Sequence, residues 1–140
     1  LGASADSIQV PWMIELAKKH GVGRHIGAGA NIWSNVHIND LVDLYLRALE
    51  HAPGGAFYYA ENGKNSMREL AQSVSRMLGY GGRTENMRVD EAVAEWGEGG
   101  ARYTMGSNSQ VRAVRARKEL GWSPSAPSLL DEIERGCYKV

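Results

Sequence analysis

Hydrophobic residues recur at helical spacing along most of the chain, and this pattern predicts six helices. Residues 7–20 show it first, because Ile8, Trp12 and Leu16 share one face and Gly21 follows the last turn as a stop signal. The other helices are expected over a segment that runs from Asn39 or Asp40 to Leu49, over residues 66–78, 90–97 and 110–120, and over a last segment that begins at Ser128.

Three of these helices begin beside side chains that accept hydrogen bonds from free backbone N–H groups. Ser66 and Glu69 have the spacing of a capping box, and Ser128 with Asp131 forms a weaker version of the same motif. Asp40, or the asparagine before it, is expected to cap the second helix.

Three short segments have the composition of β-strands. They are residues 36–38, the aromatic-rich residues 56–60, which are expected to be buried, and residues 85–89. Two or three isolated strands do not form a stable sheet by themselves. The sequence therefore predicts a helix-rich α/β fold whose two or three short strands belong at the edge of a larger sheet.

Composition narrows the function classes. Sixteen basic and sixteen acidic residues leave a formal net charge of zero, which argues against a nucleic-acid or membrane-surface role. The apolar runs are short and interrupted by charges, so no membrane span is expected. A single cysteine, Cys137, excludes an internal disulfide and favours a cytoplasmic location.

Signatures of catalysis and metal binding are scarce. The glycine-rich residues 27–31 lack the third glycine of a dinucleotide-binding turn and precede a strand, which favours a surface loop. The four histidines have no paired spacing, so a zinc site is not expected. Cys137 lies near the end of a helix and is interpreted as an inert thiol.

His37 and Asp40 form one candidate pair for acid–base chemistry, because a carboxylate can orient an imidazole. The structural alternative, which we favour, is that Asp40 caps the helix while His37 satisfies a buried backbone group. Arg102 and Arg112 flank residues 106–109, which are rich in hydrogen-bond donors, so the two guanidinium groups suit a phosphate or carboxylate ligand. Surface solubility is an equal alternative for both arginines.

Taken in order, several segments resemble the extended short-chain dehydrogenases/reductases, the NAD-dependent epimerase/dehydratase family. Residues 33–44 resemble the Val-His-x-x-Asp-Leu-Ala segment of that family, and residues 56–60 resemble the strand that follows it. Residues 66–70 are similar to its Ser-x-x-Glu-Leu-Ala helix, residues 116–124 to its Leu-Gly-Trp-x-Pro signature, and residues 128–131 to its closing helix. Each segment alone is weak evidence for the resemblance, but together and in this order the segments cover nearly the whole chain.

The resemblance implies that residues 1–140 are the C-terminal, substrate-side portion of a Rossmann-type enzyme whose N-terminal Rossmann half is absent here. That half would carry the glycine-rich turn, NAD or NADP, and a catalytic Tyr-x-x-x-Lys pair. None of the six tyrosines of this chain has a lysine four residues later. No catalytic residue and no cofactor are therefore expected on this chain, which is predicted to be inactive alone.

The resemblance also suggests substrate contacts. Gln9 and Asn35 fall where the family lines its pocket, and Arg102 matches an arginine that binds diphosphate. Trp33 stands where sugar-nucleotide epimerases carry a second arginine, which favours a smaller or less charged hydroxyl or carbonyl substrate over a sugar nucleotide. The predicted substrate-binding residues are therefore Gln9, Trp33, Asn35, Arg102 and Arg112.

Two functions remain open at this stage. The first is the substrate-binding part of an NAD(P)-dependent epimerase, dehydratase or reductase, whose partners are its own N-terminal half and a small-molecule substrate. An exposed apolar patch, where the missing sheet would pack, also predicts that the chain either self-associates into a homo-oligomer or is only marginally stable. The second function is a stand-alone, non-catalytic, helix-rich binding module.

Overall fold

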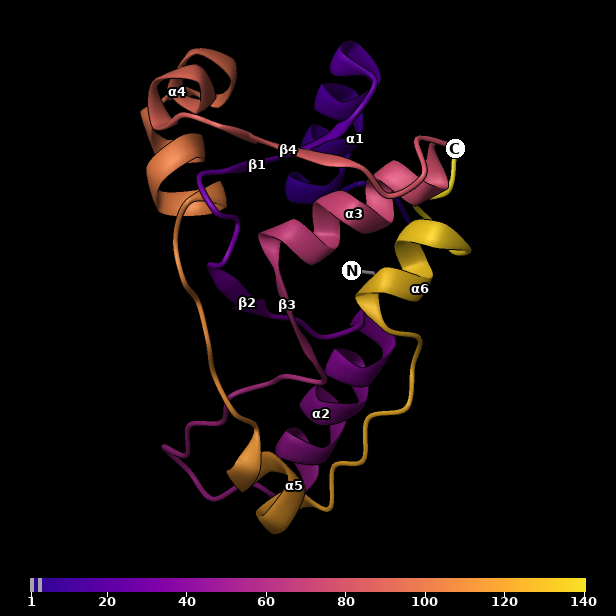
Figure 1. Cartoon of the computed structure of the whole chain (residues 1–140). Helices are drawn as coiled ribbons and strands as arrows, with labels where there is room; N and C mark the ends of the chain where they lie inside the picture. Colours follow the sequence, from indigo (N-terminus) through magenta and orange to yellow (C-terminus); the bar gives the residue numbers. More distant parts are fainter. Residues whose placement is uncertain (1, 3) are drawn as a thin grey trace.

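Figure 1 shows the computed structural model of the chain, which describes Gly2 and residues 4–140. Helices dominate, with four short strands among them. In chain order the elements are α1 (Gln9–His20), β1 (Gly23–Ile26), β2 (Ile32–Ser34), α2 (Ile38–His51), β3 (Lys64–Ser66), α3 (Met67–Met77), β4 (Thr84–Met87), α4 (Val89–Glu98), the π-helix η1 (Gly99–Met105), α5 (Val114–Leu120) and α6 (Leu129–Glu134).

The main core lies between the β1–β4 pair and three helices. β1 and β4 are parallel, and α1 and α3 pack against β1 while α6 packs against α3. Figure 1 shows this group in the upper part of the molecule, with α4 and η1 at one side. The buried residues of this core include Leu70, Val74, Ile133 and Tyr138. Burial of these apolar side chains is the main force that holds the group together.

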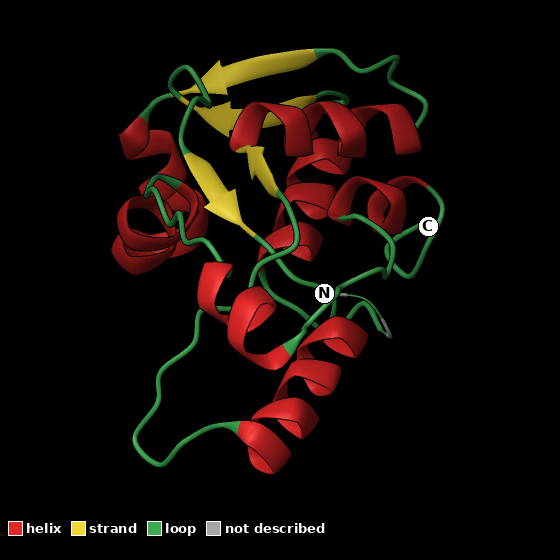
Figure 2. Ribbon diagram, turned by 90° about the horizontal axis from the view of Figure 1, so that it is seen from below, coloured by secondary structure: helices red, strands yellow, loops and turns green. Residues whose placement is uncertain are grey.

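A second antiparallel pair, β2 and β3, connects this core to the rest of the chain. Ile32 pairs with Ser66 and Ser34 with Lys64. Figure 2 shows the strands close together in the upper part of the view, with helices on both sides of them. At the other end of the molecule α2 packs against α5 (Figure 1), over a smaller core centred on Trp122.

Several local predictions are confirmed. α1, α3 and α4 occupy the expected segments, and β4 covers most of the strand expected at residues 85–89. Ser66 and Glu69 form the complete capping box, since the Ser66 hydroxyl accepts from the Glu69 N–H and the Glu69 carboxylate accepts from the Ser66 N–H. The box at Ser128 and Asp131 is also present.

The strand predicted over residues 36–38 is wrong. The strand lies earlier, at β2, and Ile38 already begins α2. The prediction that Asn39 or Asp40 caps this helix is also wrong. His37 is the N-cap, because its imidazole Nδ1 accepts a hydrogen bond from the Asn39 N–H at 3.1 Å.

The buried strand predicted over residues 56–60 is likewise wrong. Within the described part of the chain this segment has no strand partner, and Phe57 and Tyr59 are 64% and 52% exposed. A strand is defined by hydrogen bonds to a neighbour, so aromatic composition alone does not produce one. The helix expected over residues 110–120 begins only at Val114.

Candidate functional site

Three of the predicted substrate-binding residues line one small cavity. Gln9 opens α1, Trp33 is the central residue of β2, and Asn35 follows that strand. Their side chains border a cavity of about 220 Å³, a volume suited to a single ring or a short acyl group. The rest of the wall includes Ser7, Val10, Met67, Leu70, Leu129 and Tyr138.

The polar groups of this small cavity are neutral and mostly paired with protein atoms. The Trp33 indole N–H donates to the carbonyl of Ser107 at 3.0 Å, which fixes the plane of the ring. The Asn35 amide donates to the side-chain oxygen of Asn65 at 3.0 Å. The hydroxyls of Ser7 and Tyr138 lie 2.9 Å apart, and burial raises the pKa of Tyr138. The cavity is therefore apolar with a few hydrogen-bonding atoms, which suits a neutral group.

A larger cavity of about 930 Å³ adjoins the small one, and Ser34 lines both. Arg112 and Lys64 contribute positive charge to the larger cavity, and Glu61 is its acidic residue. Burial by itself raises the pKa of Glu61, but hydrogen bonds from Arg117 and from backbone N–H groups outweigh burial and lower the pKa below its ordinary value. Glu61 is therefore ionised at neutral pH and paired with Arg117 at 2.8 Å.

Arg102 lines neither cavity. It lies on η1, and its guanidinium pairs with Glu98 at 2.5 Å on the exposed surface. The donor-rich loop between Arg102 and Arg112 is engaged inside the protein, since Asn108 accepts from the N–H of Ile32 at 2.8 Å. The structure thus brings Arg112 near the predicted cavity and separates Arg102 from it, and substrate contact by either arginine stays a prediction.

His37 and Asp40 are both buried and both have structural partners. His37 Nε2 lies 3.4 Å from the carboxylate of Glu132. The Asp40 carboxylate accepts hydrogen bonds from the backbone N–H groups of Ser125 and Ala126. The structural interpretation of this pair is thus supported, although the helix is capped by His37 and Asp40 holds a distant loop.

The glycine-rich turn of residues 27–31 does not provide a dinucleotide cradle. It leads into β2, and its Gly29 and Asn31 carbonyls accept hydrogen bonds from the first N–H groups of α3. A Cβ added at Gly29 would lie 2.7 Å from the ring of His25, so the turn is closed by packing. Phosphate binding needs free N–H groups at the start of a helix, and this turn does not present them.

Three further features concern metal binding, membrane insertion and thiol reactivity. No group of three His, Cys, Asp or Glu side chains among the described residues is placed to hold a metal ion. Over Gly2 and residues 4–140, no helix combines the length and apolarity that a membrane span requires. Burial raises the pKa of the Cys137 thiol, and a hydrogen bond to Glu132 raises it further, so the thiol is a poor nucleophile.

Sequence reasoning missed several cavity residues. Ser7 and Tyr138 are 131 positions apart in the sequence, so no local pattern connects their hydroxyls. Lys64 enters the larger cavity because β3 pairs with β2 in a particular register. Such a register is a tertiary property that the spacing of residues does not reveal.

Comparisons with known proteins place this fold. No known family profile matches the chain. A curated relative, the oxidase ucsJ of Acremonium, is 29% identical over 143 residues, which span 87% of this chain and 40% of the relative. The dTDP-glucose 4,6-dehydratase DesIV of Streptomyces venezuelae, solved with NAD bound, superposes with a TM-score of 0.68 at 19% identity, over 99% of this chain and 40% of the enzyme. The UDP-glucose 4-epimerase of Thermotoga maritima gives a TM-score of 0.67 at 16% identity, over 96% and 40%.

The chain therefore has the fold predicted for the C-terminal part of an extended short-chain dehydrogenase/reductase. This confirms the helix-rich α/β fold class, with four short strands where two or three were expected. The chain spans about two fifths of the length of the curated relatives it matches.

Proposed function

We propose that this chain is the substrate-side part of a longer NAD(P)-dependent enzyme of the epimerase, dehydratase or reductase type. In this proposal the small cavity bordered by Gln9, Trp33 and Asn35 binds a small hydroxyl or carbonyl compound. Cofactor binding and the catalytic acid–base pair belong to an N-terminal Rossmann half. The residues of this chain orient the substrate.

The convergence of Gln9, Trp33 and Asn35 on one cavity carries the proposal. The three residues were assigned to a pocket through the family resemblance, and they border a common space of about 220 Å³. Because the lining is uncharged, a diphosphate would lose its hydration there without gaining a cationic partner. The flat face of Trp33 suits a ring or acyl group instead. A small neutral substrate fits this balance.

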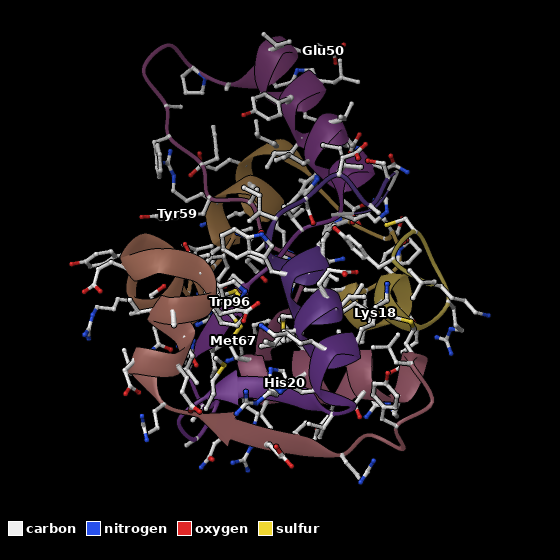
Figure 3. The ribbon with its side chains drawn as sticks, turned by 90° about the horizontal axis from the view of Figure 1, so that it is seen from above. Lys18, His20, Glu50, Tyr59, Met67 and Trp96 are labelled. Atoms are coloured by element: carbon white, nitrogen blue, oxygen red, sulfur yellow. The ribbon has the colours of Figure 1, made fainter. Side chains whose placement is uncertain are left out.

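Unpartnered apolar surface supports the existence of a Rossmann half. α2 exposes a face made of Ile38, Val42, Tyr45, Leu46 and Leu49, of which Leu49 is 82% exposed. Residues 56–60 lie beside this helix, with apolar contacts between Tyr58, Ala60 and the α2 residues around Leu44. Figure 3 shows Tyr59 pointing outward from the molecule. An apolar helix face beside a segment without strand partners is suited to the edge of a larger sheet.

The substrate class is tested by nuclear magnetic resonance with the ¹⁵N-labelled 140-residue chain. Benzyl alcohol and cyclohexanone are titrated while the indole N–H signal of Trp33 and the amide signals of Asn35 are observed. Saturable shifts confined to residues around the small cavity are expected, and UDP-glucose should produce smaller ones. Trp33→Phe identifies the indole signal and Trp33→Ala should weaken binding. Trp12→Phe, which changes a tryptophan outside this cavity, is the matched control. Shifts of the Trp33 indole and Asn35 amide signals that are larger with UDP-glucose than with the neutral compounds would contradict the proposed substrate class.

A further inference from the structure

The larger cavity has a charge balance that neither the resemblance nor the small cavity explains. Lys64 and Arg112 both line it, and both side chains are exposed to its solvent. Within Gly2 and residues 4–140, neither cation forms an ion pair, whereas the acid of the cavity, Glu61, is paired with Arg117. We propose that this cavity is an oxyanion site, which binds the carboxylate or phosphate group of a small organic molecule.

The charge of Glu61 is already compensated, so it does not cancel the two cations. One carboxylate oxygen accepts from Arg117 at 2.8 Å and from the N–H of Ala113 at 3.1 Å. The other accepts from the N–H of Gly63 at 3.3 Å. Glu61 thus orders the floor of the cavity, and the net charge that an entering ligand meets is positive. Arg115 on α5 differs, because its guanidinium is paired with Glu119 at 2.8 Å.

Ser34 holds in place the backbone segments that carry Lys64 and Arg112. Ser34 pairs with Lys64 across the β2–β3 ladder. The Ser34 hydroxyl also accepts from the N–H of Val111 at 3.0 Å and donates to the carbonyl of Val111 at 3.1 Å, which fixes the residue before Arg112. The backbone that carries both cations is therefore in place before a ligand arrives, and this reduces the backbone entropy lost on binding.

The chemistry of the lining favours an oxyanion attached to a ring. A guanidinium binds the two oxygens of a carboxylate or phosphate in parallel, while an ammonium adds a second, more flexible point charge. Gln110 contributes amide donors, and the exposed ring of Tyr59 provides an apolar surface in the same cavity. A volume of about 930 Å³ accommodates a molecule larger than a free inorganic ion.

The site is tested by titrating the ¹⁵N-labelled chain with benzoate, phenyl phosphate, inorganic phosphate and, as a neutral comparator, benzyl alcohol. We expect saturable shifts at Lys64, Gln110 and Arg112 with the two aromatic anions, weaker ones with inorganic phosphate, and none there with benzyl alcohol. Lys64→Gln and Arg112→Gln should each weaken binding about 5-fold, a modest factor because both cations are exposed to water. Arg112→Lys should restore part of the loss. Lys118→Gln, which removes a positive charge from α5, is the matched control and should leave the affinity for the anions unchanged.

Each outcome decides for or against the oxyanion site. Equal affinity for benzoate in the wild type and in the Lys64→Gln/Arg112→Gln double variant would overturn it, as would no saturable shift with any of the three anions. Circular dichroism spectra of the variants show that the fold is kept. Because benzyl alcohol reports on the small cavity and the anions on the large one, failure of the oxyanion site leaves the proposed function standing, and the reverse also holds.

Discussion

Removal of the Asp40 carboxylate tests how α2 is held to the loop of Ser125 and Ala126, which leads into α6. Asp40 lies in the first turn of α2 and is 7% exposed. Its Oδ1 accepts from the N–H of Ser125 at 2.9 Å and from the N–H of Ala126 at 3.2 Å, and its Oδ2 lies 3.2 Å from the same Ala126 nitrogen. Its carbonyl also accepts from the indole N–H of Trp122 at 2.8 Å. The side chain thus connects α2 to the segment that leads into α6.

The expected cost follows from these contacts. Asp40→Ala leaves two partly buried N–H groups without their acceptor. A hydrogen bond to a charged group contributes about 1.5–3 kcal/mol, and an unsatisfied donor costs a similar amount. Because one oxygen is shared and the donors are not fully buried, we expect a total loss of about 2–4 kcal/mol in the free energy of unfolding. Asp40→Asn keeps one acceptor but turns its amide group toward the Ala126 N–H, and should cost about 1–2 kcal/mol.

Urea unfolding at neutral pH, followed by circular dichroism, measures these losses. Asp43→Ala is the matched control, because Asp43 lies one turn later on α2 and forms an exposed pair with Arg47. That pair should contribute less than about 0.5 kcal/mol. If Asp40→Ala costs no more than Asp43→Ala, the reasoning is refuted. A negligible loss for Asn beside about 1 kcal/mol for Ala would instead indicate a helix cap, since the two residues cap about equally well.

Three further predictions concern Leu49, Glu132 and Arg102. Leu49→Glu, on the exposed face of α2, should reduce self-association of the chain in sedimentation velocity, and a wild type that stays monomeric at high concentration would contradict the apolar patch. A hydrogen bond from the backbone N–H of Cys137 is the main cause that lowers the pKa of Glu132 in the folded state. The stability that this provides is complete above the ordinary carboxyl pKa of about 4.3 and is lost as the pH falls through the lowered folded value. Glu132→Gln should therefore flatten the acid side of a plot of unfolding free energy against pH. In the proposed longer enzyme, the family resemblance predicts that Arg102→Ala raises KM without lowering Tm. Unchanged kinetics would end that assignment and would agree with the exposed pairing of Arg102 with Glu98.

The helices of this chain could be predicted because their signals are local. The apolar period of α3 and the Ser66–Glu69 box lie within a few residues of each other and do not depend on the rest of the fold. β1 was missed because its sequence, Gly-Arg-His-Ile, has no strong alternation, and its partner β4 lies about sixty residues later. Residues 56–60 show the converse, since they have the composition of a strand but no strand partner within the described chain.

The residues of the candidate site also fall into those that the sequence could predict and those that depend on the tertiary structure. Gln9, Trp33 and Asn35 were assigned through a resemblance that records where a family lines its pocket, and these residues meet at one cavity. Lys64 was not foreseen, because its place depends on the register of β2 and β3. Arg102 has the expected distance in sequence from the Leu-Gly-Trp segment, but it lies on the π-helix η1 and pairs with Glu98. Spacing along the chain does not fix the direction of a side chain when the intervening backbone is irregular.

Calorimetric titration with NADH and NADPH tests the central proposal most directly. The 140-residue chain and the protein encoded by the complete gene are titrated under the same conditions. We expect the longer protein to bind one dinucleotide with a dissociation constant on the order of micromolar, which corresponds to a binding free energy of about −8 kcal/mol. We expect no binding by the 140-residue chain, because the turn of residues 27–31 is closed by Gly29 packing against His25. Micromolar binding by the 140-residue chain, or none by the folded longer protein, would contradict the central proposal.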